Sequence, residues 1–150
     1  MNKITVITGA NTGLGLETTK AFAEKNIEVV MACRNESKAE KAKAEILKEI
    51  PKAQLKILPL DLSSLDAVRS FAEKFKSEYD RLDILVNNAG VRLYQRVTEA
   101  SEESWDTILG VNVKGYAFCA KAAIPVLRRA GNGSIVNIAS NNAVIAGDNT

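Results

Sequence analysis

Histidine is absent from this sequence of 150 residues. Its absence excludes mechanisms that pair histidine with a serine or cysteine nucleophile, and it removes the commonest metal ligand. The two cysteines, Cys33 and Cys119, match neither a Cys-x-x-Cys pair nor a zinc-finger spacing. We interpret them as buried structural thiols, and we predict no metal site. Proton transfer must therefore use Tyr, Lys, Asp, Glu, Ser or bound water.

Long apolar runs and a strong charge bias are also missing. No stretch approaches the roughly 20 apolar residues of a membrane-spanning helix. The amino terminus has a strand pattern rather than the pattern of a signal peptide. The net charge is only +2, and acids alternate with lysines in stretches such as ESKAEKAKAEILKEI. We therefore expect a cytoplasmic protein with no nucleic-acid or membrane partner.

The length fits one domain, and the apolar pattern predicts alternating strands and helices. The expected strands cover residues 3–8, 28–33, 53–60, 82–88 and 134–140. The expected helices cover 14–25, 37–50, 64–79 and 101–129, the last with a break near Gly110. Apolar strands that alternate with helices indicate an α/β fold with a doubly wound parallel sheet, strand order 3-2-1-4-5 and helices on both faces. A ligand crevice is expected between strands 1 and 4, at their carboxyl ends.

Two local features of the helices follow from the same pattern. In the first helix, Leu14, Thr18, Ala21 and Phe22 share one face. Ser37 is the expected cap of the second helix, and a proline at position 51 ends it.

Three glycines follow the first strand in the stretch TGANTGLG. Gly9 permits a tight turn, Gly13 lets the backbone approach a diphosphate, and Gly15 lets the helix close on the strand. The free N–H groups of the helix would then face the anion. Asn11, Thr12 and Leu14 complete this predicted phosphate loop. A turn that merely needs positive φ is the alternative, whereas no Gly-Lys-Ser/Thr follows for a nucleoside triphosphate loop.

The end of the second strand indicates which dinucleotide binds. An NAD site usually places Asp or Glu there, but this sequence has Arg34 and Asn35. A carboxylate would repel a 2′-phosphate, whereas Arg34 can pair with it and stack on adenine. We therefore predict NADP(H) in preference to NAD(H). The alternative is that Arg34 is an ordinary surface arginine.

Further motifs occur in a fixed order. TGANTGLG is followed by DL at Asp61 and Leu62, by NNAG at 87–90, by VNVKG at 111–115, and by a strand, SIVNIAS, that ends at Ser140. With these motifs the whole chain resembles the short-chain dehydrogenase/reductase family. The resemblance implies a Rossmann-like NAD(P)-binding domain over residues 1–150. It also implies an oxidoreductase that moves a hydride between nicotinamide and a carbonyl or alcohol carbon of a small molecule.

The resemblance also implies roles for individual residues, and three of these residues have a structural alternative. Asp61 and Leu62 would contact the adenine, unless Asp61 only caps the following turn. Asn88, Ala89 and Gly90 would line the cofactor ribose, unless Asn88 only ties sheet backbone. Asn112 would hold a water in the proton relay, or would relieve a helix kink, and Ser140 would hydrogen-bond the substrate carbonyl.

One part of the family pattern is missing. The family uses a Tyr-x-x-x-Lys pair as its acid and base, and none of the three tyrosines has a lysine four residues later. We therefore expect the chain to stop before the family's catalytic pair and later strands. The alternatives to a complete oxidoreductase are a non-catalytic NADP(H)-binding module or a fragment with little turnover. A structural protein without ligand is disfavoured by the glycines and Arg34.

The resemblance also bears on assembly. The helix over residues 101–129 resembles the element that the family uses in subunit pairing, and the fifth strand would expose an apolar edge. We therefore expect a homo-oligomer, formed through that helix or through strand pairing.

Overall fold

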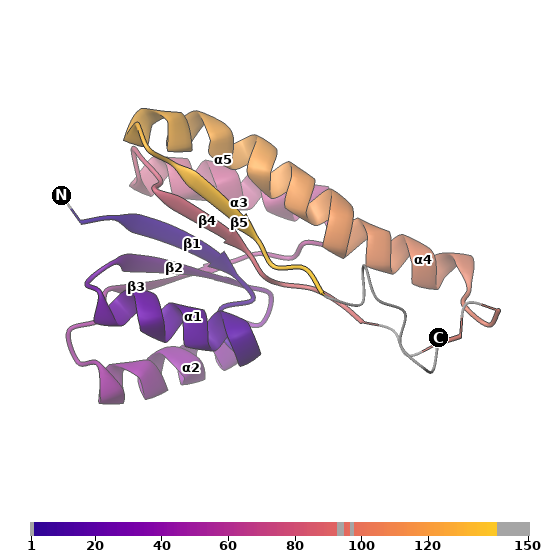
Figure 1. The fold of residues 1–150 in the computed structure, drawn as a ribbon, viewed down its shortest axis with the longest axis horizontal. Helices are drawn as coiled ribbons and strands as arrows, with labels where there is room; N and C mark the ends of the chain where they lie inside the picture. The colour runs from indigo at the N-terminus through magenta and orange to yellow at the C-terminus, as the bar shows by residue number, and fades with distance from the viewer. Residues whose placement is uncertain (1, 93–94, 97, 141–150) are drawn as a thin grey trace.

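The computed structural model describes residues 2–92, 95–96 and 98–140 (Figure 1). Five strands form one parallel sheet in the order β3-β2-β1-β4-β5. They are β1 (Ile4–Thr8), β2 (Glu28–Cys33), β3 (Leu55–Pro59), β4 (Ile84–Asn87) and β5 (Ser134–Asn137). The predicted α/β fold and strand order are confirmed. β5 ends at Asn137, so that Ser140 lies beyond the strand rather than at its last position.

The helices cover both faces of the sheet (Figure 1). α1 (Gly13–Glu24) and α2 (Glu36–Glu49) lie on one face, and α3 (Leu65–Glu78) and α5 (Tyr116–Ala130) lie on the other. α4 (Glu102–Leu109) continues through a π-helical segment, η1 (Gly110–Gly115), into α5. The break predicted near Gly110 is therefore a widened turn inside a continuous helix. α4 extends past the sheet and has no buried residue.

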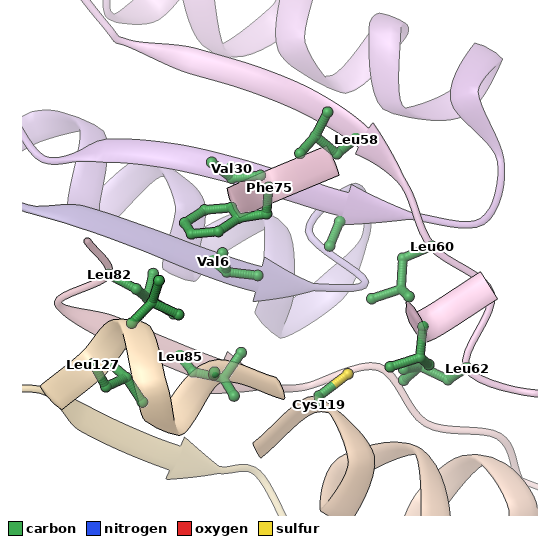
Figure 2. Close-up of a cluster of buried hydrophobic side chains, with 14 of the residues drawn as sticks. Val6, Val30, Leu58, Leu60, Leu62, Phe75, Leu82, Leu85, Cys119 and Leu127 are labelled. Carbon is green, nitrogen blue, oxygen red and sulfur yellow. The ribbon is translucent and has the colours of Figure 1, made fainter. Parts of the chain in front are cut away.

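Two apolar layers hold the helices on the sheet. Figure 2 shows the layer beneath α3 and α5, where Val6, Leu85 and Phe75 meet Cys119 and Leu127. The opposite layer, beneath α1 and α2, contains Ile7, Val29, Met31 and Ile46. Full burial of one large aliphatic or aromatic side chain contributes about 1.5–3 kcal/mol. The sheet is thus fixed on both faces, and its carboxyl ends give the following loops a rigid base.

The inward face of α1 differs from the face that the sequence pattern grouped together. Gly15, Thr19 and Ala23 are buried, whereas Leu14 is 69% exposed. The reason is the close approach of α1 to β1, since a Cβ added to Gly15 would lie 2.2 Å from the carbonyl oxygen of Gly9. Small residues therefore face the sheet, and the apolar side chain of Leu14 is left at the surface.

The cap predicted for the second helix differs from the one in the structure. Asn35, not Ser37, caps α2, because its side chain accepts a hydrogen bond of 2.9 Å from the N–H of Lys38. Ser37 is the second residue of the helix, so it does not occupy the N-cap position from which a side chain reaches the free N–H groups of the first turn. Ser64 and Ser101, the expected first residues of their helices, are the N-caps of α3 and α4.

Neither a membrane span nor a metal cluster is found in the described part of the chain. None of its helices is long and apolar enough to cross a bilayer. Within the same residues, no group of three His, Cys, Asp or Glu side chains could hold a metal ion. Both cysteines are buried as predicted and form no disulfide, and burial raises the pKa of each thiol to about 11.

Candidate dinucleotide-binding site

A groove of about 960 Å³ lies at the carboxyl ends of the strands. Its volume is in the range of sites that hold a large organic ligand. The groove brings together every site residue predicted from the sequence except Gly13 and Gly15. These lining residues are Gly9, Asn11, Thr12, Leu14, Arg34, Asn35, Asp61, Leu62, Asn88, Ala89, Gly90, Asn112 and Ser140.

The three glycines of the phosphate loop are required for different reasons. Gly9 and Gly13 have φ of +66° and +53°, a backbone conformation that side chains disfavour. A Cβ on Gly9 would also lie 3.0 Å from Ala89, so this turn touches the loop after β4. An added Cβ on Gly13 would meet nothing within 4 Å. Gly13 is therefore favoured by its positive φ alone, whereas Gly15 is required by the close packing of α1 against Gly9.

The beginning of α1 is suited to an anion. Thr12 is the N-cap residue, but its side chain makes no capping hydrogen bond to the first turn. First-turn N–H groups of a helix have no intrahelical partner and carry partial positive charge. The bare backbone around Gly13, together with this uncapped end, leaves space for a diphosphate. The residues present therefore fit the predicted ligand.

Thr8 connects the loops after β1 and β4. Its Oγ1 accepts hydrogen bonds of 2.9 Å from the N–H groups of both Asn88 and Ala89. The Asn88 side chain donates in return to the carbonyl oxygens of Thr8, at 2.9 Å, and Gly9, at 3.4 Å. Asn88 therefore makes the backbone tie that was its structural alternative. A role in lining the cofactor ribose remains a prediction.

One end of the groove carries positive charge. Arg34 and Lys38 both line it, and Asp61 lies near Arg34. Partial burial raises the pKa of the Asp61 carboxyl, but hydrogen bonds from Ser63 and the charge of Arg34 outweigh that effect and hold it below its usual value. Ser63 donates to Asp61 through its N–H, at 2.9 Å, and its hydroxyl, at 2.7 Å. Asp61 thus caps the turn after β3, which was its structural alternative.

Lys38 was missed in the sequence. It lies on the first turn of α2, whose N-cap Asn35 directly follows Arg34. The available signal was a second cation soon after Arg34, at the start of the expected helix. It was hidden because the stretch resembles a solvated helix with alternating charges.

The opposite end of the groove is held by Asn112. Its Oδ1 accepts a hydrogen bond from the N–H of Val91, and its Nδ2 donates to the carbonyl oxygen of the same residue, both at 2.9 Å. Asn112 lies inside η1, so it occupies the irregular turn that was its structural alternative. π-helical turns occur frequently at functional sites. Ser140 lies at this end of the groove and is exposed.

The described tyrosines do not have the properties of an acid or base near neutral pH. Tyr116 lines the groove, and burial raises the pKa of its phenol. The pKa of Tyr79 is also raised, by burial and by its hydrogen bond of 2.6 Å to Glu28. Tyr94 lies outside the described residues. The family's chemistry requires a tyrosine pKa that is lowered, and neither Tyr79 nor Tyr116 meets that requirement.

Comparison with known proteins identifies the family. The family model for short chain dehydrogenases matches residues 3–150, and the chain belongs to this family. Retinol dehydrogenase 12 of the mouse (Mus musculus) is 38% identical over 140 residues, which is 92% of this chain and 43% of that protein.

Solved structures agree with this assignment. L-sorbose reductase from Gluconobacter frateurii, complexed with NADPH and L-sorbose, matches with a TM-score of 0.89 and 28% identity over 95% of this chain and 54% of that chain. A metagenomic short-chain oxidoreductase in complex with NADP matches with a TM-score of 0.85 and 30% identity, over 99% of this chain and 65% of that chain. The chain thus spans 43% to 65% of the lengths of these three relatives.

The tie through Thr8 can be tested by Thr8→Val. The valine has the same shape but cannot accept the two partly buried N–H groups, and an unpaired buried donor costs about 1–3 kcal/mol. We expect the free energy of unfolding, measured with urea, to fall by about 1–3 kcal/mol, and Thr8→Ser to restore most of it. Thr18→Val is the matched control, because the Thr18 hydroxyl donates only to a carbonyl of its own helix. Equal losses in the two valine variants would contradict the role of Thr8.

Proposed function

We propose that the chain is the dinucleotide-binding part of an NADP(H)-dependent oxidoreductase, which moves a hydride between nicotinamide and a carbonyl or alcohol carbon. The observation that carries the NADP(H) preference is the pair of cations, Arg34 and Lys38, at one end of the groove. A 2′-phosphate needs positive charge at the end of β2, where an NAD site usually has an acid. Asp61 opposes this preference with one negative charge, and the two cations outnumber it.

The other parts of the cofactor can be assigned to residues along the groove. We propose that the loop Gly9–Gly15 holds the diphosphate, that Asp61 and Leu62 contact the adenine, and that Asn88, Ala89 and Gly90 line a ribose. When bound, the nicotinamide would supply or accept the hydride. Asn112 would hold a water for the proton relay, and Ser140 would hydrogen-bond the substrate carbonyl. A small-molecule partner in the cytoplasm, with no nucleic acid or membrane involved, remains our prediction from the sequence.

The preference for NADP(H) is tested by binding titrations with NADPH and NADH, followed by fluorescence. We expect the native chain to bind NADPH more tightly. Arg34→Asp should reverse the order, because it replaces a hydrogen-bonding cation with an anion, and Lys38→Glu should weaken NADPH binding by about 10- to 100-fold. Lys48→Glu makes the same change of charge about 15 Å further along α2, beyond the Debye length. If Lys38→Glu and Lys48→Glu behave alike, a direct role of Lys38 is wrong.

The second candidate function is nucleotide binding without turnover. It is favoured by the raised pKa values of Tyr79 and Tyr116 and by the lack of a lysine four residues after any tyrosine. Loss of a general acid typically costs about 10² to 10⁴ in rate. We expect the 150-residue chain to reduce a panel of ketones, and to oxidise a panel of alcohols, only at the background rate. Robust turnover would show that another group supplies the proton.

We also propose that the chain self-associates through α4 and η1. Trp105, Leu109 and Val113 are 45%, 44% and 56% exposed, and they recur every four residues along one side of this helix. Exposed apolar stripes of this kind mark contact surfaces. β5, whose Ile135 and Val136 are also exposed, is the alternative contact.

The contact is tested by Leu109→Glu combined with Val113→Glu, with mass measured by light scattering after size exclusion. We expect oligomers of the native chain at tens of micromolar, and at least a tenfold higher concentration should be needed for association of the double variant, because the glutamates would be buried without partners. Thr107→Glu adds an acid to α4 off the stripe and should change little. A monomeric native chain would contradict the proposal, and loss of association only with Val136→Lys would assign the contact to β5.

A further inference from the structure

The segment η1 and the first residue of α5 contact the loops that follow β3, β4 and β5. A Cβ on Gly115 would lie 3.1 Å from the Cβ of Leu62, in the loop after β3. Asn112 makes its two hydrogen bonds with Val91, in the loop after β4. Tyr116, directly after η1, donates from its hydroxyl to the carbonyl oxygen of Ile138, after β5, at 3.3 Å. The end of the groove that contains Ser140 is therefore bordered by loops attached to one short helical segment.

The contact with Ile138 lies directly after the end of β5. The N–H of Ile138 donates to the carbonyl oxygen of Asn87 at 2.8 Å, one residue beyond the last position of β5. The carbonyl of Ile138 is the group that Tyr116 holds, and Ser140 follows two residues later. Ile138 is thus bonded to β4 on its amide side and to the helix on its carbonyl side.

Tyr116 is suited to a permanent contact of this kind. Its ring packs against the apolar layer beneath α3 and α5, which fixes the direction of the hydroxyl. A phenol is protonated at neutral pH, and burial raises the pKa of Tyr116 further, so the hydroxyl is a hydrogen-bond donor. The Tyr116 hydroxyl donates to a carbonyl oxygen. Replacement by phenylalanine would therefore preserve the packing of the ring and remove only this hydrogen bond.

We propose that Tyr116 is a positioning residue, which holds the backbone between β5 and Ser140 against the helix that carries Asn112. The distance between this backbone segment and the helix would then be set before any ligand binds. Sites held in their binding geometry bind more tightly because less ordering is needed on association. The assignment of this half of the groove to nicotinamide rests on the proposed function, whereas the backbone restraint on Ile138 does not.

The test is Tyr116→Phe, with binding of NADPH compared against binding of adenosine 2′,5′-bisphosphate, which contains only the adenine half of the cofactor. We expect NADPH to bind about three- to tenfold more weakly, because one neutral hydrogen bond is lost, and the bisphosphate to bind as before. Hydrogen exchange at the Ile138 amide should become faster by a similar factor. Tyr79→Phe is the matched control, since Tyr79 also loses a hydroxyl bond, to Glu28, away from the groove.

The outcomes separate this proposal from the proposed function. If the native chain binds neither ligand, the proposed function is wrong, and hydrogen exchange alone decides the role of Tyr116. Equal weakening of NADPH and the bisphosphate would indicate a general loss of structure and overturn the positioning role. Unchanged NADPH binding with unchanged exchange at Ile138 would overturn it as well.

Discussion

The hydrogen bonds between Thr8 and the loop after β4 are the interaction on which the candidate site depends. In the order β3-β2-β1-β4-β5, β2 and β3 are added on one side of β1, and β4 and β5 are added on its other side. The loops after β1 and β4 therefore separate to opposite faces, and a crevice opens between them. Thr8 bridges that crevice with one oxygen atom that accepts two N–H groups.

This tie imposes the glycines at positions 9 and 15. With the loop after β4 held against Thr8, Ala89 comes so close to Gly9 that even a Cβ there would lie 3.0 Å away. The carbonyl of Gly9 in turn lies over α1 at Gly15, where a side chain would collide with it. Packing within the protein thus constrains Gly9 and Gly15, and Gly9 also has a positive φ, whereas a Cβ added to Gly13 would meet nothing within 4 Å.

The polar residues of the groove are bonded to the protein before they meet a ligand. Asp61 accepts from Ser63, Asn88 donates to Thr8, and Asn112 is paired with Val91. For each of them the structural alternative considered from the sequence is therefore realised. A structural contact does not compete with a binding role here, because a side chain held in one position spends no rotamer entropy when a ligand arrives.

Much of the fold could be predicted from the sequence, because buried parallel strands read as short apolar runs and the handedness of the crossovers restricts their order. The errors have local causes. The inward face of α1 was misplaced because Gly15, which packs against the turn after β1, contributes no apolar signal. The cap of α2 was placed at Ser37, although Asn35 has the same capping chemistry two residues earlier. Tyr116 and its partner Ile138 are 22 residues apart, a long-range contact that periodicity does not report.

The two ends of the groove are built on opposite faces of the sheet. Arg34 and Lys38 belong to the end of β2 and the start of α2, whereas Asn112 and Tyr116 belong to the helix that covers the other face with α3. Besides the sheet and the tie at Thr8, the loop after β3 joins the two groups, because Asp61 lies near Arg34 and Leu62 lies against Gly115 of η1. Lys38 has no part in these contacts, so a substitution there changes the charge offered to the ligand at a distance from Asn112 and Tyr116. This separation would allow the preference for a cofactor and the shape of the reacting end to vary independently on one scaffold.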